Sequence, residues 1–239
     1  DLADGNVYKM LSKGKTIGIF QLESNGMQNV LTGLNPERFE DIMAVLSLFR
    51  PGPMENIPKY INRKQGQEKV EYMHDKLSTI LEETYGIFIY QEQVMQAAQI
   101  LAGYSLSSAD ILRRAMGKKD RKEMEEQKQN FIDGAVHHGL TSEISEDIFE
   151  QIAAFAGYGF NKSHAAAYAL ISYQCAWLAH NHPAEWMAAF LDKEPESRKE
   201  KAINIAKGFG FNIRKLDVNT SGRVWEISED GETLVQPLT

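Results

Sequence analysis

Residues 110–122 read Asp-Ile-Leu-Arg-Arg-Ala-Met-Gly-Lys-Lys-Asp-Arg-Lys and join two predicted helices. Ser107 and Asp110 are residue types that favour the start of the first helix. Gly117 is the usual residue for a left-handed cap at its end. A second helix is expected to begin near Asp120. The apolar face of the first helix is predicted to comprise Ile111, Leu112, Ala115 and Met116.

The same stretch gathers six positive charges in thirteen residues of a chain whose formal net charge is -7. Arg113 and Arg114 lie off the apolar face of the first helix. The cations that follow crowd the start of the second helix, where the helix dipole already favours an anion. We therefore expect a phosphate site here. The alternative is a solvated basic face in which Arg114 pairs with Asp110. The later cations are Lys118, Lys119, Arg121 and Lys122.

The whole chain has the composition of a folded protein. Its 239 residues are 43% hydrophobic and 25% charged, enough to bury a core. The negative charge argues against a protein that coats nucleic acid, so any such contact should be local. Cys175 is the single cysteine, which excludes an intrachain disulfide and a cysteine-based zinc site. The longest apolar run, residues 165–179, is too short to span a bilayer.

No signal peptide opens the chain, so we expect a cytoplasmic protein without a membrane partner. The chain begins at Asp1 rather than Met, and its last residues follow directly on a strand-like run. We therefore expect a segment of a longer protein.

Hydrophobic periodicity predicts a mainly α fold over residues 1–206 and a small β appendage over residues 207–239. Alternating residues and the Asp230-Gly231 turn predict a hairpin in the appendage. Propensity favours a strand at residues 85–90, and a short extended segment is expected near Thr16. Helices are expected at residues 7–11, 26–31, 36–49, 91–101, 123–138, 142–156, 163–180, 183–191 and 197–209. Their predicted N-caps include Ser24, Asn35 (before Pro36), Thr141 and Ser163.

A second candidate site lies at Gly157-Tyr-Gly-Phe-Asn-Lys-Ser-His164, where a glycine-bearing loop leads into a helix. Lys162 and His164 fall on the first turn of that helix. Asn161 and Ser163 add hydrogen-bonding groups beside the free backbone N–H groups, an arrangement that suits an anion. The alternative for His164 is an ordinary histidine at a helix start.

Several catalytic patterns are missing from the sequence. There is no phosphate-loop motif, no dinucleotide-binding glycine fingerprint, no nucleophile elbow and no zincin motif. His137 and His138 are adjacent, so they point about 100° apart on a helix and do not share a metal. Glu82, Glu83 and Asp217 are interpreted as surface carboxylates. The residues alone thus predict a phosphate-binding helical module without a catalytic residue or a metal ligand of its own.

Motifs spread over residues 16–190 resemble, in order, the fingers region of the bacterial DNA polymerase III alpha subunit, a C-family replicative polymerase. The tail, Leu216-Asp-Val-Asn219, resembles the linker toward the family's helix-hairpin-helix module. The motifs are Ile19–Ser24 with Gly26-Met27, Leu48–Pro53, Tyr85-Gly86 with Tyr90–Met95, Asp110 with Leu112–Lys119, and Tyr158–His164.

The resemblance implies a multi-helix fingers domain within a DNA-directed DNA polymerase. The polymerase would use Mg²⁺ held by palm aspartates outside this chain, so the segment itself would bind no metal and be inactive alone. Its implied partners are primer–template DNA and dNTP, with the sliding clamp and other replisome subunits contacted through regions outside this chain. The implied nucleotide-binding residues are Arg113, Arg114, Lys118, Lys119, Asn161, Lys162, His164 and Arg50, with Gln21, Ser24 and Gln91 as supporting residues.

Two further interpretations stay open at this point. One is a non-enzymatic helical module that binds nucleic acid through its phosphates, and the other is an interaction scaffold whose basic face is only solvated. A fingers domain requires Arg113 and Arg114 to converge with Asn161–His164 on one cleft, because both would contact a single nucleotide. An open basic stripe would favour the first alternative, and two separate patches the second.

Overall fold

The computed structural model describes residues 2–118 and 121–238 of the chain, which is helical along most of this length. The mainly α fold is therefore confirmed. The α-helices are α1 Gly5–Leu11, α2 Asn25–Leu34, α3 Phe39–Leu48, α4 Ile57–Lys64, α5 Ser78–Leu81, α6 Gln91–Ala102, α7 Leu106–Lys118, α8 Arg121–His137, α9 Ser142–Ala156, α10 Lys162–Asn181, α11 Pro183–Lys193 and α12 Lys199–Gly208. Short 3-10 helices are η1 Pro53–Asn56, η2 Asp75–Leu77, η3 Glu82–Thr84 and η4 Glu196–Arg198, and the strands are β1 Asn212–Arg214, β2 Glu226–Ile227 and β3 Thr233–Val235.

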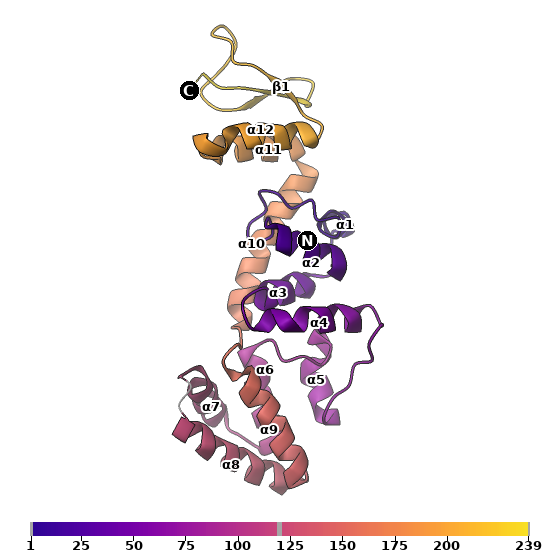
Figure 1. Cartoon of the computed structure of the whole chain (residues 1–239), viewed down its shortest axis with the longest axis vertical. Helices are drawn as coiled ribbons and strands as arrows, with labels where there is room; N and C mark the ends of the chain where they lie inside the picture. The colour runs from indigo at the N-terminus through magenta and orange to yellow at the C-terminus, as the bar shows by residue number, and fades with distance from the viewer. Residues whose placement is uncertain (1, 119–120, 239) are drawn as a thin grey trace.

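The molecule is elongated, and α10 runs along its long axis (Figure 1). Helices α1 to α4 lie beside α10 in the middle of the molecule, α6 to α9 form a group at one end, and α11, α12 and the strands lie at the other end. Each group has its own cluster of buried side chains. The start of α10 therefore lies at the junction between the middle group and the α6–α9 group.

The middle core forms where α10 packs on α3 and α1. Ala165, Ala169 and Ala176 of α10 are fully buried in it, together with Tyr173. Their small side chains let the helix backbones approach closely, as the alanine-rich sequence predicts. Tyr173 also packs its ring against Tyr8 of α1, with the centroids 5.6 Å apart. This packing fixes α10, and with it the loop that precedes the helix.

The second core is formed by helices α5 to α9. Phe131 of α8 and Phe149 of α9 pack their rings with centroids 5.6 Å apart. Gly134 of α8 lies against α6, because an added Cβ there would meet the carbonyl oxygen of Ala102 at 2.3 Å. The sequence thus places a residue without a side chain where two helix backbones touch.

The C-terminal strands form a three-stranded sheet in the order β1-β3-β2, with β1 parallel and β2 antiparallel to β3. The predicted hairpin is confirmed, since Asp230 accepts hydrogen bonds from the Glu232 and Thr233 N–H groups in the turn. Leu234 of β3 and Trp225 are buried in one cluster with Leu191 of α11. The sheet therefore packs on α11 and α12.

Two predicted N-caps are confirmed and two are wrong. Ser24 and Thr141 cap α2 and α9 by accepting backbone N–H groups. Asn35 instead ends α2 in a left-handed conformation (φ 50°), which asparagine tolerates, and α3 begins only at Phe39. Asn161 rather than Ser163 caps α10, because its Oδ1 accepts the His164 N–H.

Three local predictions for extended or turn structure are also wrong. Residues 85–90 form no strand, and only Tyr90 makes an isolated parallel bridge with Phe160. Residues near Thr16 form consecutive turns around Gly18 and Gln21, both with positive φ. Gly117 lies inside α7, which continues to Lys118, so it is not a left-handed cap. At residues 85–90 and near Thr16, packing against neighbouring elements overrides the local preference.

The predicted apolar face of α7 is partly correct. Leu112, Ala115 and Met116 are buried, but Ile111 is 47% exposed, and Ala109 takes the fourth buried position. Arg113 and Arg114 lie off this face, as predicted. Lys119 and Asp120 lie outside the described residues, and α8 begins at Arg121.

Candidate functional site

The candidate site is centred on the first residues of α6, which lie between α7 and the loop before α10. The Gln91 N–H donates to the carbonyl oxygen of Phe160 at 2.9 Å, and its side-chain Nε2 donates to that of Gly159 at 3.1 Å. Its Oε1 accepts a hydrogen bond from Nη1 of Arg113 at 3.4 Å. Gln91 thereby connects the arginine-bearing helix to the 157–160 loop. The sequence predicted both elements, and the structure joins them through one amide.

The next residue of α6, Glu92, forms hydrogen bonds with the N-terminus of α10. Its carboxylate accepts the Lys162 N–H and the Asn161 side-chain amide, each at 2.9 Å. The Asn161 Oδ1 in turn accepts the His164 N–H at 2.8 Å. Two of the backbone donors that a phosphate would use are therefore already bonded within the chain. The expectation that the α10 N-terminus offers free N–H groups thus holds only in part.

The Lys162 side chain points toward α6 and η3. Its Nζ lies 2.6 Å from Oε2 of Glu83 and 5.4 Å from the ring centroid of Tyr90. The other Glu83 oxygen is buried without a hydrogen-bond partner among the described residues. The interpretation of Glu83 as a surface carboxylate is only partly correct, because its side chain is 31% exposed but one oxygen is buried and the other pairs with a candidate site residue. Burial raises the pKa of Tyr90, and the nearby Glu83 charge adds to this.

His164 lies on the exposed side of the first turn of α10. Its ring stacks with Tyr168 at a centroid distance of 4.1 Å and contacts Phe160 at 5.4 Å. Tyr168 also contacts Phe20, which directly precedes Gln21. These ring contacts orient the imidazole, and the residue as a whole is exposed.

Arg113 and Arg114 share one carboxylate, that of Asp110. Arg113 pairs with Oδ1 at 2.7 Å, and Arg114 forms a short contact with Oδ2. The two guanidinium groups, Arg114 first, lower the pKa of Asp110 below its usual value. The predicted pairing of Arg114 with Asp110 is confirmed, and Arg113 joins it. With side chains 34% and 64% exposed, both arginines remain within reach of a ligand in solvent.

Arg50 supports the loop from the other side. Its Nε donates to the carbonyl oxygen of Ser47 at 2.8 Å, and its Nη2 donates to that of Tyr158. The guanidinium also lies over the Phe160 ring, 4.5 Å from the centroid. Burial lowers the pKa of Arg50, which still leaves it a cation at neutral pH. Through its contacts with Tyr158 and Phe160, Arg50 stabilises the 157–160 loop.

The remaining predicted residues are less involved. Ser24 is the N-cap of α2 and accepts the Met27 N–H at 3.3 Å. Gln21 adopts φ 62° in an exposed turn. Lys118 is the last residue of α7, and Lys119 lies outside the described residues. No contact joins Gln21 or Ser24 to Arg113 in the described part of the chain.

Sequence reasoning missed Glu92 and the role of Glu83. The only local signal for Glu92 is an acidic residue in the first turn of α6, a position that the helix dipole favours anyway. Within residues 2–118 and 121–238, no group of three His, Cys, Asp or Glu side chains is placed to hold a metal ion. No described helix is long and apolar enough to cross a membrane.

Residues 1–139 match the family model described as the bacterial DNA polymerase III alpha subunit finger domain. Three curated relatives, each named DNA polymerase III subunit alpha, come from Caulobacter vibrioides, Campylobacter jejuni and Rickettsia felis. They are 50%, 48% and 50% identical to this chain over 97%, 98% and 91% of its length. The alignments cover 20%, 20% and 18% of these relatives. The chain thus spans about a fifth of the length of the curated relatives it matches.

Proposed function

Because the chain belongs to the bacterial DNA polymerase III alpha subunit finger-domain family, we propose that it acts in DNA replication by binding the triphosphate of the incoming dNTP. In this proposal the segment works within a DNA-directed DNA polymerase, on primer–template DNA, in the cytoplasm. The Mg²⁺ that such polymerases use would be held outside the described residues.

The triphosphate would be bound first by Arg113 and Arg114. A guanidinium presents paired N–H donors that match phosphate oxygens, and its charge stabilises the negative charge that moves during phosphoryl transfer. Both groups are held by Asp110 on one exposed side of α7. The phosphates would take the place of this carboxylate, so that the arginines exchange one anion for another.

The observation that carries the proposal is the position of Gln91 between Arg113 and the carbonyl oxygen of Gly159. This bridge supports a single cleft shared by α7 and the start of α10, rather than two separate basic patches. His164 and Lys162 would then meet the nucleotide from the α10 side, and Arg50 would hold the loop between them. The nascent base pair would be covered by the same elements.

The test is Arg113→Ala in the full-length polymerase subunit, assayed by steady-state incorporation of single nucleotides. We expect kcat/KM for dNTP to fall at least tenfold, which corresponds to about 1.4 kcal/mol of transition-state stabilisation. Arg198→Ala is the matched control, because Arg198 also pairs with a carboxylate on its own chain segment, Glu194, far from α7. Equal kcat/KM values for the wild type and Arg113→Ala would reject the proposed role.

A second measurement separates the polymerase proposal from a non-enzymatic module that binds nucleic acid. Loss of phosphate contacts to DNA would raise the Kd for primer–template in the absence of dNTP and reduce its salt dependence. The proposal instead requires Arg113→Ala to change dNTP use while leaving this Kd within about twofold of the wild-type value, a difference of roughly 0.4 kcal/mol.

A further inference from the structure

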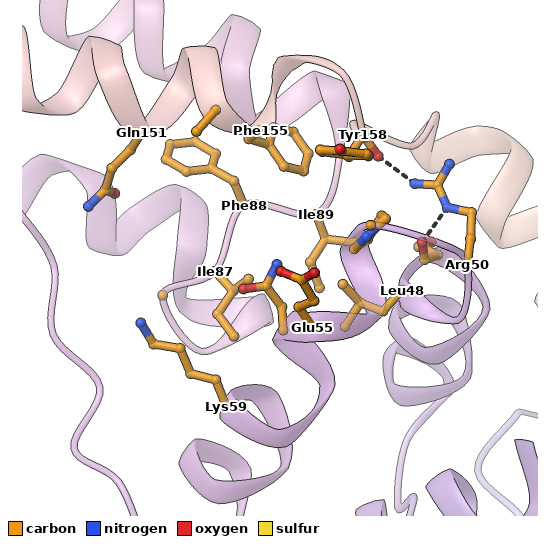
Figure 2. Close-up of a pocket in the computed structure, with 16 residues that line it drawn as sticks. Leu48, Arg50, Glu55, Lys59, Ile87, Phe88, Ile89, Gln151, Phe155 and Tyr158 are labelled. Atoms are coloured by element: carbon orange, nitrogen blue, oxygen red, sulfur yellow. Dashed lines mark hydrogen bonds between the residues drawn. The ribbon is translucent and has the colours of Figure 1, made fainter. Parts of the chain in front are cut away.

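A cavity of about 340 Å³ lies beside the candidate site, on the side of α3, α4 and α9 (Figure 2). Its size falls at the lower end of the range for ligand pockets, roughly 300–1,000 Å³. Arg50 and Tyr158 line it, but Arg113, Arg114, Lys162 and His164 do not. It is therefore a separate space that shares one wall with the site described above.

The cavity has an apolar floor. It is formed by the buried side chains of Leu48, Ile87, Phe88 and Ile89. Phe88 packs against Phe155 of α9, with ring centroids 6.0 Å apart. Phe88 and Phe155 form one side wall of the cavity, and Tyr158 continues this wall. The Tyr158 ring lies close over Gly52, where an added Cβ would be 2.3 Å from a ring carbon of Tyr158. The result is a run of flat aromatic surface along one side of the cavity.

The rim of the cavity is polar. Figure 2 shows Gln151 on the side of the aromatic residues, opposite Glu55 and Lys59. Glu55, Lys59 and Gln151 are exposed, and within the described part of the chain their side chains make no hydrogen bond or ion pair. A cation, a carboxylate and an amide are thus free at the mouth, whereas the Arg50 guanidinium is engaged by two carbonyl oxygens and a ring.

We propose that this cavity binds an unpaired nucleobase together with its attached phosphate. A base has two flat apolar faces, which match the aromatic wall, and a polar edge, which matches the Glu55 and Gln151 side chains at the rim. Lys59 would pair with the phosphate. The proposal rests on the proposed polymerase function, because that function brings single-stranded template and free nucleotides to the protein.

The base has two sources, the unpaired template strand and a free nucleotide. The test uses 2-aminopurine, whose fluorescence changes when it stacks on an aromatic ring. One arm places it at successive positions of the template overhang of a primer–template, and the other adds free 2-aminopurine deoxynucleoside 5′-monophosphate. Both arms use the full-length subunit. A response confined to the template arm assigns the template as the source, and a response in the monophosphate arm assigns the free nucleotide.

Two variants test the rim. Lys59→Ala removes the cation, and Gln151→Glu adds a negative charge while keeping the side chain's size. We expect each to raise the concentration of half-maximal response about five- to tenfold, the effect of losing one ordinary hydrogen bond. Both positions are exposed and without partners, so folding should be unaffected. Lys201→Ala, an exposed lysine on α12, is the matched control.

The proposal is supported if both variants weaken a wild-type response in either arm. It is overturned if the wild type gives no response, or if either variant stays within twofold of Lys201→Ala. The Arg113→Ala assay separates this outcome from the main function. Reduced dNTP use in Arg113→Ala, with no 2-aminopurine response, would reject the cavity alone. A response lost in the rim variants, with normal dNTP use in Arg113→Ala, would reject the triphosphate site alone.

Discussion

The carboxylate of Glu92 accepts the backbone N–H of Lys162 at 2.9 Å, across 70 residues of sequence. The contact ties the start of α6 to the start of α10. It also fills, with a group of the protein itself, part of the position where a helix N-terminus would attract a phosphate. A ligand at this junction would therefore depend more on side chains than on the backbone donors of the α10 N-terminus.

Glu92→Ala should destabilise the protein. The substitution leaves the Lys162 N–H and the Asn161 amide without their acceptor, and losing a cap of this kind costs about 1–2 kcal/mol. Urea unfolding should show a lower midpoint with an unchanged slope. Glu143→Ala is the control, because Glu143 lies in the first turn of α9 without such a contact. Equal midpoints for the two variants would mean that Glu92 is not a structural cap.

The bridge through Gln91 makes a prediction about coupling. Gln91→Ala should lower kcat/KM for dNTP a few-fold in the full-length subunit, because Arg113 loses its link to the 157–160 loop. In an Arg113→Ala background the same change should have little further effect, since the coupled partner is already missing. Fully additive losses in the double variant would show that the two residues act separately. Gln129→Ala on α8, which removes a local contact to Asp133, serves as control.

Two helical glycines should respond in opposite directions to alanine. At Gly134 an added Cβ would lie 2.3 Å from the Ala102 carbonyl oxygen, so Gly134→Ala should destabilise by about 1–3 kcal/mol as α8 is pushed from α6. At Gly117 no atom lies within 4 Å of the added Cβ, so Gly117→Ala should stabilise by about 0.5–1 kcal/mol through helix propensity. Thermal unfolding measures both. A loss of stability at Gly117 would contradict the continuous α7.

The shared carboxylate of Asp110 predicts a pH dependence. Its pKa is lowered by Arg114 and Arg113, so the folded state favours the ionised form. The resulting stabilisation is complete above the ordinary aspartate pKa of about 3.9 and is lost as pH falls through the lowered value. The difference in unfolding midpoint between wild type and Asp110→Asn should therefore shrink as pH falls from about 5 toward 2. A difference that grows over this range would contradict the ion pairs.

The family and most of the helices could be predicted from the sequence. The motifs from Ile19 to His164 identify the finger-domain family, and hydrophobic periodicity places α6 to α12 and the C-terminal hairpin close to their observed bounds. These features are local, since a period of 3.6 or 2 residues is visible within one segment. The weaker predictions concern Asn35, Ser163 and residues 85–90, where short segments adopt the conformation that their neighbours allow.

The sequence alone therefore determined the mainly α fold, the family and the two cation-bearing stretches around Arg113 and Lys162. Only the tertiary structure decided what those cations touch: Glu83 against Lys162, Glu92 at the start of α10, and Gln91 between Arg113 and Gly159. Each of these contacts joins side chains or backbone groups 22 or more residues apart. Local periodicity carries no information about such pairs, because they form only when packed cores bring separate elements together.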